Sequence, residues 1–191
     1  MTHKLILALL VSASSLAAAQ PSAATPGSEP AALAASAELQ DVDGNVVGDV
    51  NFTESESADG PLVTVQVGLE PDSGIAPGEY GFHLHQVGAC TPSFDAAGDH
   101  INPEGVAHGL LSPAGPHPGD LPNLVVGDDG ATTYVVSTRL VTLSGGDAGL
   151  FDEDGSAVML HAQADDYITD PSGTSGDRIA CGVVAEEAAG E

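Results

Sequence analysis

The chain has 191 residues, enough for one domain with a hydrophobic core plus short appendages. Its 28 acidic residues face only three basic ones, which gives a formal charge of −25 at pH 7. A surface this acidic repels nucleic acids and anionic lipids, so neither is an expected partner. The charge itself fits adaptation to high salt, or a surface that binds cations.

The chain begins with a pattern typical of a secretory signal peptide, predicted over residues 1–19. Lys4 precedes an apolar run from Leu5 to Val11, and three small residues end the segment before Gln20. The run is too short to span a bilayer and no second run follows, so we expect export to the periplasm or the extracellular space without a membrane span. Loss of this segment would leave two arginines against 28 acidic residues, a charge of about −26.

Short strands are the next expected elements. Residues 20–36 are small, proline-containing and aperiodic, which predicts a flexible tether. Over residues 37–185 short apolar runs alternate with turn residues; in one of them Val63, Val65 and Val67 recur at the spacing of a strand buried on one face. About eight such runs without a helical period predict an all-β domain, an antiparallel Greek-key sandwich or barrel of the immunoglobulin-like kind. Residues 186–191 are an acidic tail.

Two stretches are too long to be hairpin connections. Residues 87–120 and 162–177 are rich in glycine, proline and aspartate, and the first holds three of the seven histidines. Long loops in a compact domain are usually functional or disordered, and the histidines favour function here.

The histidines outside the first segment cluster in or beside these loops. In a strand, His83 and His85 would present both imidazoles on one face about 6.5 to 7 Å apart, although such a pair alone also fits ordinary hydrogen-bonded histidines. Six histidines and one carboxylate make seven donors, the number needed by two four-ligand zinc or copper sites that share one imidazole. The seven donors are His83, His85, His100, His108, His117, His161 and Asp120.

The chain has two cysteines, Cys90 and Cys181. Export would place them where disulfides persist, and only one intramolecular pairing is possible. A metal-bound or a catalytic thiol is the alternative, which the absence of any C-x-x-C spacing makes the weaker interpretation.

Five segments together resemble the copper, zinc superoxide dismutase family. They are GFHLH, GDHINPEGVAHG, GPHPGDL, MLHAQADD and GDRIACGVV, in this order, and the similarity spans roughly residues 37–185. The resemblance implies the family's β-sandwich fold with one copper and one zinc per subunit.

Site residues follow from the resemblance. The implied copper ligands are His83, His85, His100 and His161, and the implied zinc ligands are His100, His108, His117 and Asp120, with His100 bridging as imidazolate. Asp165 would orient one histidine of each metal, unless it is an ordinary acidic loop residue. Cys90 and Cys181 would form the intrasubunit disulfide. Arg178, three residues before Cys181, would draw the anion to copper and with His100 forms the implied catalytic pair; its alternative role is an ion pair with a neighbouring acid.

The implied reaction is dismutation of superoxide to oxygen and hydrogen peroxide by a redox-cycling copper, with zinc in a structural role. One alternative is a module of the same fold that holds copper and zinc for storage or delivery with little turnover. Another, a zinc-stabilised adhesion sandwich, would leave the second histidine set without a purpose. A homodimer is compatible with the resemblance, but nothing in the sequence marks an interface.

Four features depart from the family pattern without removing a ligand. Gln86, Asp99 and Thr174 replace more usual residues, and the second long loop contains no lysine. The net charge should slow the approach of superoxide at low salt, unless Arg178 and copper maintain a local positive funnel. These departures concern the speed of the reaction, not its identity.

Overall fold

The structure is a computed structural model that describes residues 32–69, 71–130 and 132–187. The expected signal peptide and the tether up to residue 31 lie outside this range. The described residues form the following elements: β1 (Leu33–Asp41), β2 (Val46–Ser55), β3 (Leu62–Leu69), β4 (Gly78–Tyr80), β5 (Phe82–His85), the short 3-10 helix η1 (Phe94–Ala97), β6 (Leu124–Val126), β7 (Thr132–Thr138), β8 (Ala157–His161), β9 (Arg178–Val183) and β10 (Ala185–Glu186). Within the described ranges no helix has both the length and the apolar character needed to cross a membrane.

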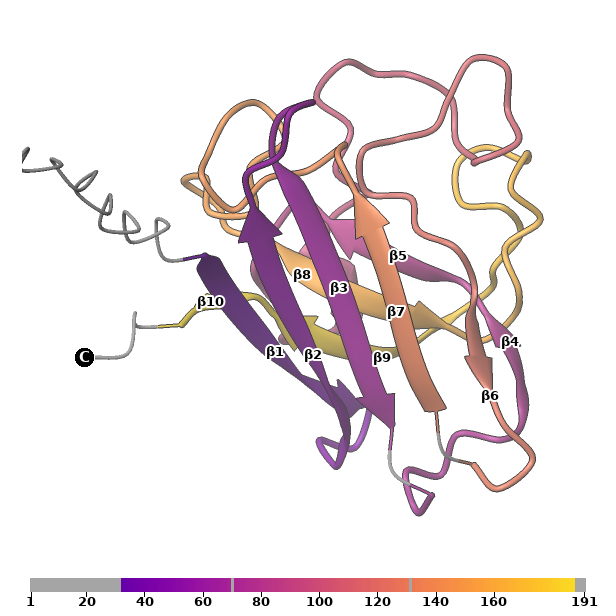
Figure 1. The fold of residues 1–191 in the computed structure, drawn as a ribbon. Helices are drawn as coiled ribbons and strands as arrows, with labels where there is room; N and C mark the ends of the chain where they lie inside the picture. The colour runs from indigo at the N-terminus through magenta and orange to yellow at the C-terminus, as the bar shows by residue number, and fades with distance from the viewer. Residues whose placement is uncertain (1–31, 70, 131, 188–191) are drawn as a thin grey trace, which may run out of the picture. The chain divides into compact units, whose positions relative to one another are not determined.

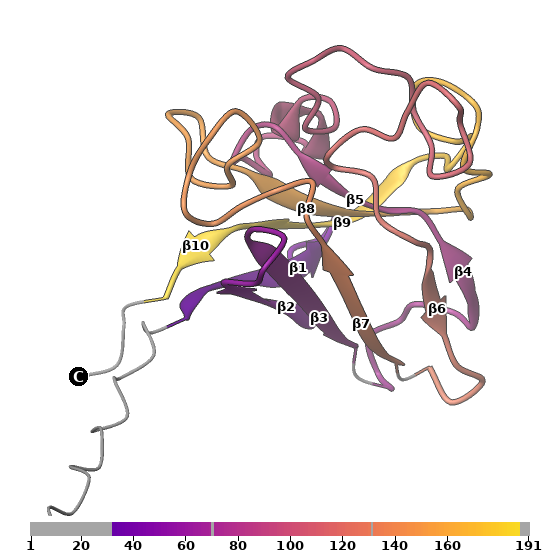
Figure 2. The ribbon, with the colours of Figure 1, turned by 45° about the horizontal axis from the view of Figure 1, so that its top comes forward.

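One curled antiparallel sheet makes up most of the fold. Its strands follow the order β5-β8-β9-β1-β2-β3-β7, β10 pairs with β1, and β4 and β6 form a separate two-stranded sheet. The curl places β1, β2, β3 and β7 in one layer and β5, β8 and β9 in the other (Figures 1 and 2). The predicted all-β, antiparallel fold is confirmed.

The core fills the space between these layers. Val63, Val65 and Val67 on β3 are fully buried, as their spacing predicts, and Val50 and Phe52 on β2 join them. Polar or partly exposed residues alternate with them on the other face of both strands. Burying each of these side chains stabilises the fold by roughly 1.5–3 kcal/mol.

The first strand begins earlier than residue 37, the expected start of the domain. Leu33 pairs with Glu54 and Ser36 with Asn51, so these residues extend the ladder between β1 and β2. Ser36 also pairs with Ala185 of β10. The small side chains of this segment give no hydrophobic pattern from which a strand could be predicted. Its place in the sheet comes from backbone pairing with partners distant in sequence.

Cys90 and Cys181 form the predicted disulfide, across a sequence separation of 91 residues. It joins the loop after β5 to β9, and no free thiol is left among the described residues. Closing so long a loop stabilises the folded state by about 4–5 kcal/mol in the chain-entropy model. The bond therefore holds one of the long loops against the sheet.

Candidate metal centre

Strand β5 supplies the first two histidines of the centre. His83 and His85 alternate with Phe82 and Leu84, and all four residues are completely buried. The two apolar side chains belong to the core, so the two imidazoles project from the opposite face of the strand, where the long loops cover them. A strand buried on both faces thus presents two histidines as candidate ligands.

Strand β8, the neighbour of β5, ends in the third histidine. The register between β8 and β9 shifts between Leu160 and His161, so His161 lies opposite Arg178. Such a bulge re-aims a side chain at the end of a strand. Here it puts an imidazole and a guanidinium at the same end of the sheet.

The loop between β5 and β6 adds the other donors and is fastened to β5 by its backbone. His100 forms an isolated bridge with His85, and Asp120 forms another with His83. Gly119 makes this approach possible, because a Cβ atom there would collide with the carbonyl oxygen of Leu84. The loop thereby lies directly on the histidine-bearing face of β5.

Four imidazoles meet in the first group of donors, and their ligand atoms lie within 4.8 Å of one another. Of the described residues' buried side-chain nitrogen and oxygen atoms, five lack a hydrogen-bond partner, and four of these belong to this group. The four atoms are His83 Nδ1, His85 Nε2, His100 Nε2 and His161 Nε2. A buried polar atom without a partner costs about 1–3 kcal/mol, so four that converge on one point fit a bound cation. Imidazole donors suit copper and zinc.

Hydrogen bonds on the opposite ring atoms fix which nitrogen carries the proton. His85 donates from Nδ1 to the carbonyl of Gly98 at 2.9 Å, and His161 donates from Nδ1 to the carbonyl of Gly176 at 3.2 Å. A carbonyl only accepts, so Nε2 of both rings is the unprotonated atom. The orphan nitrogens are therefore lone pairs, as a metal requires.

Three imidazoles and a carboxylate form the second group. Asp120 Oδ1 lies 2.8 Å from His100 Nδ1, 3.0 Å from His108 Nδ1 and 3.2 Å from His117 Nδ1. Asp120 Oδ2 accepts backbone N–H groups from Gly109 and His117 at 2.8 and 2.9 Å, which leaves Oδ1 to face the three rings. Three nitrogens and one oxygen around a point suit the tetrahedral coordination of zinc.

His100 is the histidine common to both groups. Its Nε2 belongs to the first set of donors and its Nδ1 to the second. Each other histidine of the described residues has only one nitrogen in these two groups; His117, for example, donates from Nε2 to the carbonyl of Val106 at 3.1 Å. The geometry thus gives His100 alone the position of a bridge.

Asp165 connects the two groups from the second long loop. Its Oδ2 accepts from His83 Nε2 at 2.9 Å and its Oδ1 from His108 Nε2 at 3.0 Å. These three residues could themselves surround a cation. We assign the carboxylate to orientation instead, because both rings offer it a proton and keep their Nδ1 atoms for the two groups.

Burial governs the protonation of the first group. It lowers the pKa of His83 to about 3, that of His85 to about 2 and that of His161 to about 4. Burial also disfavours the charged form of His108, but hydrogen bonds to Asp120 and Asp165 outweigh it and raise that pKa to about 9. The first group therefore consists of neutral rings, whereas the second combines charges of opposite sign.

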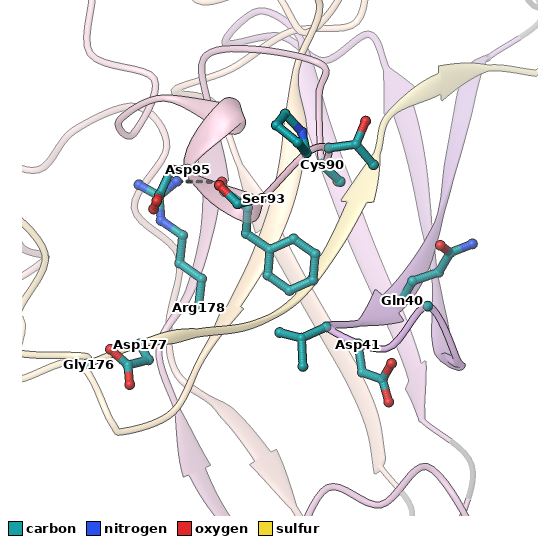
Figure 3. A pocket seen from close by; sticks show the side chains of 13 residues that line it. Gln40, Asp41, Cys90, Ser93, Asp95, Gly176, Asp177 and Arg178 are labelled. Carbon is teal, nitrogen blue, oxygen red and sulfur yellow. Dashed lines mark hydrogen bonds between the residues drawn. The ribbon is translucent and has the colours of Figure 1, made fainter.

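Arg178 lies beside the first group. Its side chain donates to the carbonyl oxygens of Phe94 and Gly98, both at 2.7 Å, and the bond to Phe94 is drawn in Figure 3. It lines a pocket of about 450 Å³ together with His85, His100 and His161. It also borders the pocket of about 600 Å³ beside Cys90 that Figure 3 shows. The ion pairs found among the described residues leave Arg178 out, so the proposed alternative of a simple ion pair finds no support.

The structure thus brings together every residue that the sequence singled out as a site residue. Gln86 and Asp99 line the same pocket as Arg178. Thr174 has a φ of 55°, a left-handed conformation in which glycine or asparagine is more usual. Sequence reasoning missed the carbonyl acceptors of Gly98 and Gly176, since any residue has a carbonyl and no side-chain signal marks it.

Fold and site together define an antiparallel half-barrel with two adjoining histidine-rich metal groups. The chain belongs to the copper/zinc superoxide dismutase family, whose sequence model matches residues 46–184. Superoxide dismutase (Cu-Zn) 2 of Aquifex aeolicus is 43% identical over 155 residues, covering 80% of this chain and 86% of that protein. Superoxide dismutase (Cu-Zn) of Caulobacter vibrioides is 40% identical over 146 residues, covering 74% and 80%. The crystal structure of a SOD-like protein from Bacillus subtilis superposes with a TM-score of 0.70 at 39% identity and covers 78% of this chain and 96% of that one.

The metal-free protein should lose stability in acid. Burial holds the pKa values of His83, His85 and His161 below the 6.5 expected in the unfolded chain, so the unfolded state binds more protons as the pH falls below about 6.5. Burial also lowers the pKa of His100, so His108, whose pKa is raised, is one group acting in the opposite sense against four. We expect the free energy of unfolding to fall by a few kcal/mol, in order of magnitude, between pH 7 and pH 5. Urea unfolding of the chelator-treated protein measures it, and equal or greater stability at pH 5 would contradict the assignment of neutral rings.

Proposed function

We propose that this chain dismutates superoxide, converting two superoxide ions and two protons into one dioxygen and one hydrogen peroxide. The observation that carries the proposal is the convergence of four unprotonated imidazole nitrogens in a pocket that Arg178 also lines. Family membership and the relatives named superoxide dismutase (Cu-Zn) support the same reaction. The relatives' names do not favour the alternative of a storage or delivery module. Such a module also has no need for Arg178, a cation that would bind an anion beside the copper.

One copper and one zinc per subunit account for all seven donors. His83 Nδ1 and the Nε2 atoms of His85, His100 and His161 would hold copper. The Nδ1 atoms of His100, His108 and His117, with Asp120 Oδ1, would hold zinc. Copper supplies a one-electron redox couple when bound, and zinc, which has no redox chemistry, supplies fixed positive charge.

His100 is the residue best placed to deliver a proton. Its Nδ1 is fixed beside Asp120, whereas its Nε2 belongs to a ring that lines the pocket shared with Arg178. Peroxide formation consumes protons where the anion is reduced, and Nε2 is the ring atom at which the chain can hold one there. Burial lowers the pKa of His100, so a proton on its Nε2 is readily given up.

Arg178 would bind and orient the anion. Its guanidinium is fixed by two carbonyl oxygens, so it enters the reaction without losing further side-chain entropy. Since carbonyls carry no net charge, its positive charge stays available to superoxide in the pocket that it lines.

Superoxide decay followed by pulse radiolysis tests the proposal directly. We expect the protein loaded with copper and zinc to react with a rate constant on the order of 10⁸ M⁻¹s⁻¹, and the same protein loaded with zinc alone to leave superoxide decay unchanged. Slow decay at full copper occupancy would refute the proposed dismutase activity and favour the storage module instead.

Salt dependence tests the role of Arg178. Because the chain has 28 acidic residues, we expect the rate constant to stay flat or rise with ionic strength. Arg178→Gln should lower it by about tenfold or more at low salt. Arg139→Gln is the matched control, since it removes the same charge from a residue that donates to Ser57, Gly60 and Pro61 in the turn after β2. A steep fall of the rate constant with added salt would contradict the expected salt dependence. Equal losses in both variants would refute a local role of Arg178.

Two expectations about the setting of the chain stay predictions. Export is supported by the signal-like pattern of residues 1–19 and by the disulfide, which suits an oxidising compartment. N-terminal sequencing of the mature protein should find Gln20 first; an uncleaved Met1 would contradict export by this route.

A homodimer would show as twice the chain mass in sedimentation equilibrium, and the mass of a single chain would exclude it.

A further inference from the structure

Two tyrosine hydroxyls form hydrogen bonds with opposite sides of the Pro122–Asn123 peptide group, which lies shortly after Asp120 in the chain. Tyr134 of β7 donates from Oη to the carbonyl of Pro122 at 2.8 Å. On the other side of that peptide, the N–H of Asn123 donates to Oη of Tyr167 at 2.7 Å. Burial, with the neighbouring Tyr167, raises the pKa of Tyr134, so this hydroxyl keeps the proton that it donates. The peptide is thus fixed from the sheet and from the second long loop at once.

The side chain of Asn123 links this fixed peptide to Asp165. Its Nδ2 donates to the carbonyl of Asp165 at 2.9 Å, and its Oδ1 accepts the N–H of Asp165 at 2.8 Å. Two parallel hydrogen bonds to one residue restrict both the position and the direction of its backbone. Because the backbone of Asp165 is restricted, so is the position of its carboxylate, which accepts hydrogen bonds from His83 and His108.

Tyr167 holds the same carboxylate through its backbone. Its N–H donates to Asp165 Oδ1 at 2.6 Å, and its carbonyl accepts the N–H of Leu111 at 3.1 Å. Its φ of 63° is uncommon for a residue with a side chain and persists only where contacts over-determine it. Gly109 packs so closely that a Cβ atom there would collide with the carbonyl oxygen of Tyr167. The two long loops accordingly lie side by side in both ribbon views (Figures 1 and 2).

We propose that Tyr167 is a positioning residue of the metal centre, which acts through Asn123 to hold the Asp165 carboxylate between His83 and His108. None of the seven metal donors forms a hydrogen bond with its hydroxyl, yet loss of that hydroxyl leaves the Pro122–Asn123 peptide held by Tyr134 alone and weakens the restraint on Asp165. The inference rests on the proposed function, because it assigns a role toward the copper and zinc of that site.

Tyr167→Phe, which removes a single oxygen atom, is the test variant. Zinc affinity of the metal-free full chain is measured by chelator competition, and the copper(II) environment by electron paramagnetic resonance of the copper- and zinc-loaded protein. We expect a loss of zinc affinity of about tenfold, the lower end of the effect of outer-shell partners, and a shifted copper spectrum. Tyr80→Phe is the matched control, because it removes a tyrosine bond of 2.8 Å to the carbonyl of Ala76 outside the centre, and it should change neither readout.

A double-mutant cycle separates positioning from general loosening. In an Asp165→Asn background, Tyr167→Phe should change zinc affinity by less than about twofold, since the residue through which it acts is already altered. If Tyr167→Phe does not fold, Asn123→Asp tests the same link, because it removes the Nδ2–H donor and retains an acceptor for the Asp165 N–H. Wild-type affinity and copper spectrum in the variant, or equal losses in both backgrounds, would overturn the inference.

Failure of the proposed function looks different. Wild-type protein that binds both ions without dismutating superoxide would refute the enzyme and leave the positioning comparison intact. Wild-type protein that binds neither ion would overturn both proposals.

Discussion

The burial of six imidazoles beneath two loops is the constraint on which the rest of this structure depends. A buried ring nitrogen without a partner is costly, so each ring except the shared His100 must direct one nitrogen to a fixed acceptor and the other to one of the two donor groups. The carbonyls of Gly98, Gly176 and Val106 and the carboxylate of Asp165 are those acceptors. They select the tautomers and ring orientations of the chain itself, so the two donor groups are preorganised.

Because the acceptors lie in loops, the loops must be held as firmly as strands. The disulfide of Cys90 ties the first loop to β9. Asp170 in the second loop accepts the N–H of His108 at 2.6 Å, and Asn123 holds Asp165 from the end of the first loop. The two loops therefore stabilise each other across the histidines. The sheet supplies three of the donors directly and anchors the loop that supplies the other four.

Sequence reasoning succeeded where the signal is a side chain at a regular spacing. The alternation of Val63, Val65 and Val67 gave the buried strand, and the donor types and spacing gave the candidate ligands before any coordinates. It could not supply the early start of β1 at Leu33, which depends on pairing with β2 and β10. The grip of Tyr167 on Asn123 was equally invisible, because it joins residues 44 positions apart through a backbone N–H that every non-proline residue possesses.

The way Arg178 is held explains how an acidic chain can still attract an anion. With 28 carboxylates in the sequence, an ion pair would be the easiest way to fix an arginine, but it would cancel the charge. Carbonyl oxygens of Phe94 and Gly98 fix the guanidinium without adding a negative charge. Asp99 lines the same pocket, but most of the 28 acids lie elsewhere, and salt screens those beyond a Debye length of about 8–10 Å from the guanidinium. The distant surface charge then governs mainly the approach, where salt screens it, whereas binding depends on Arg178.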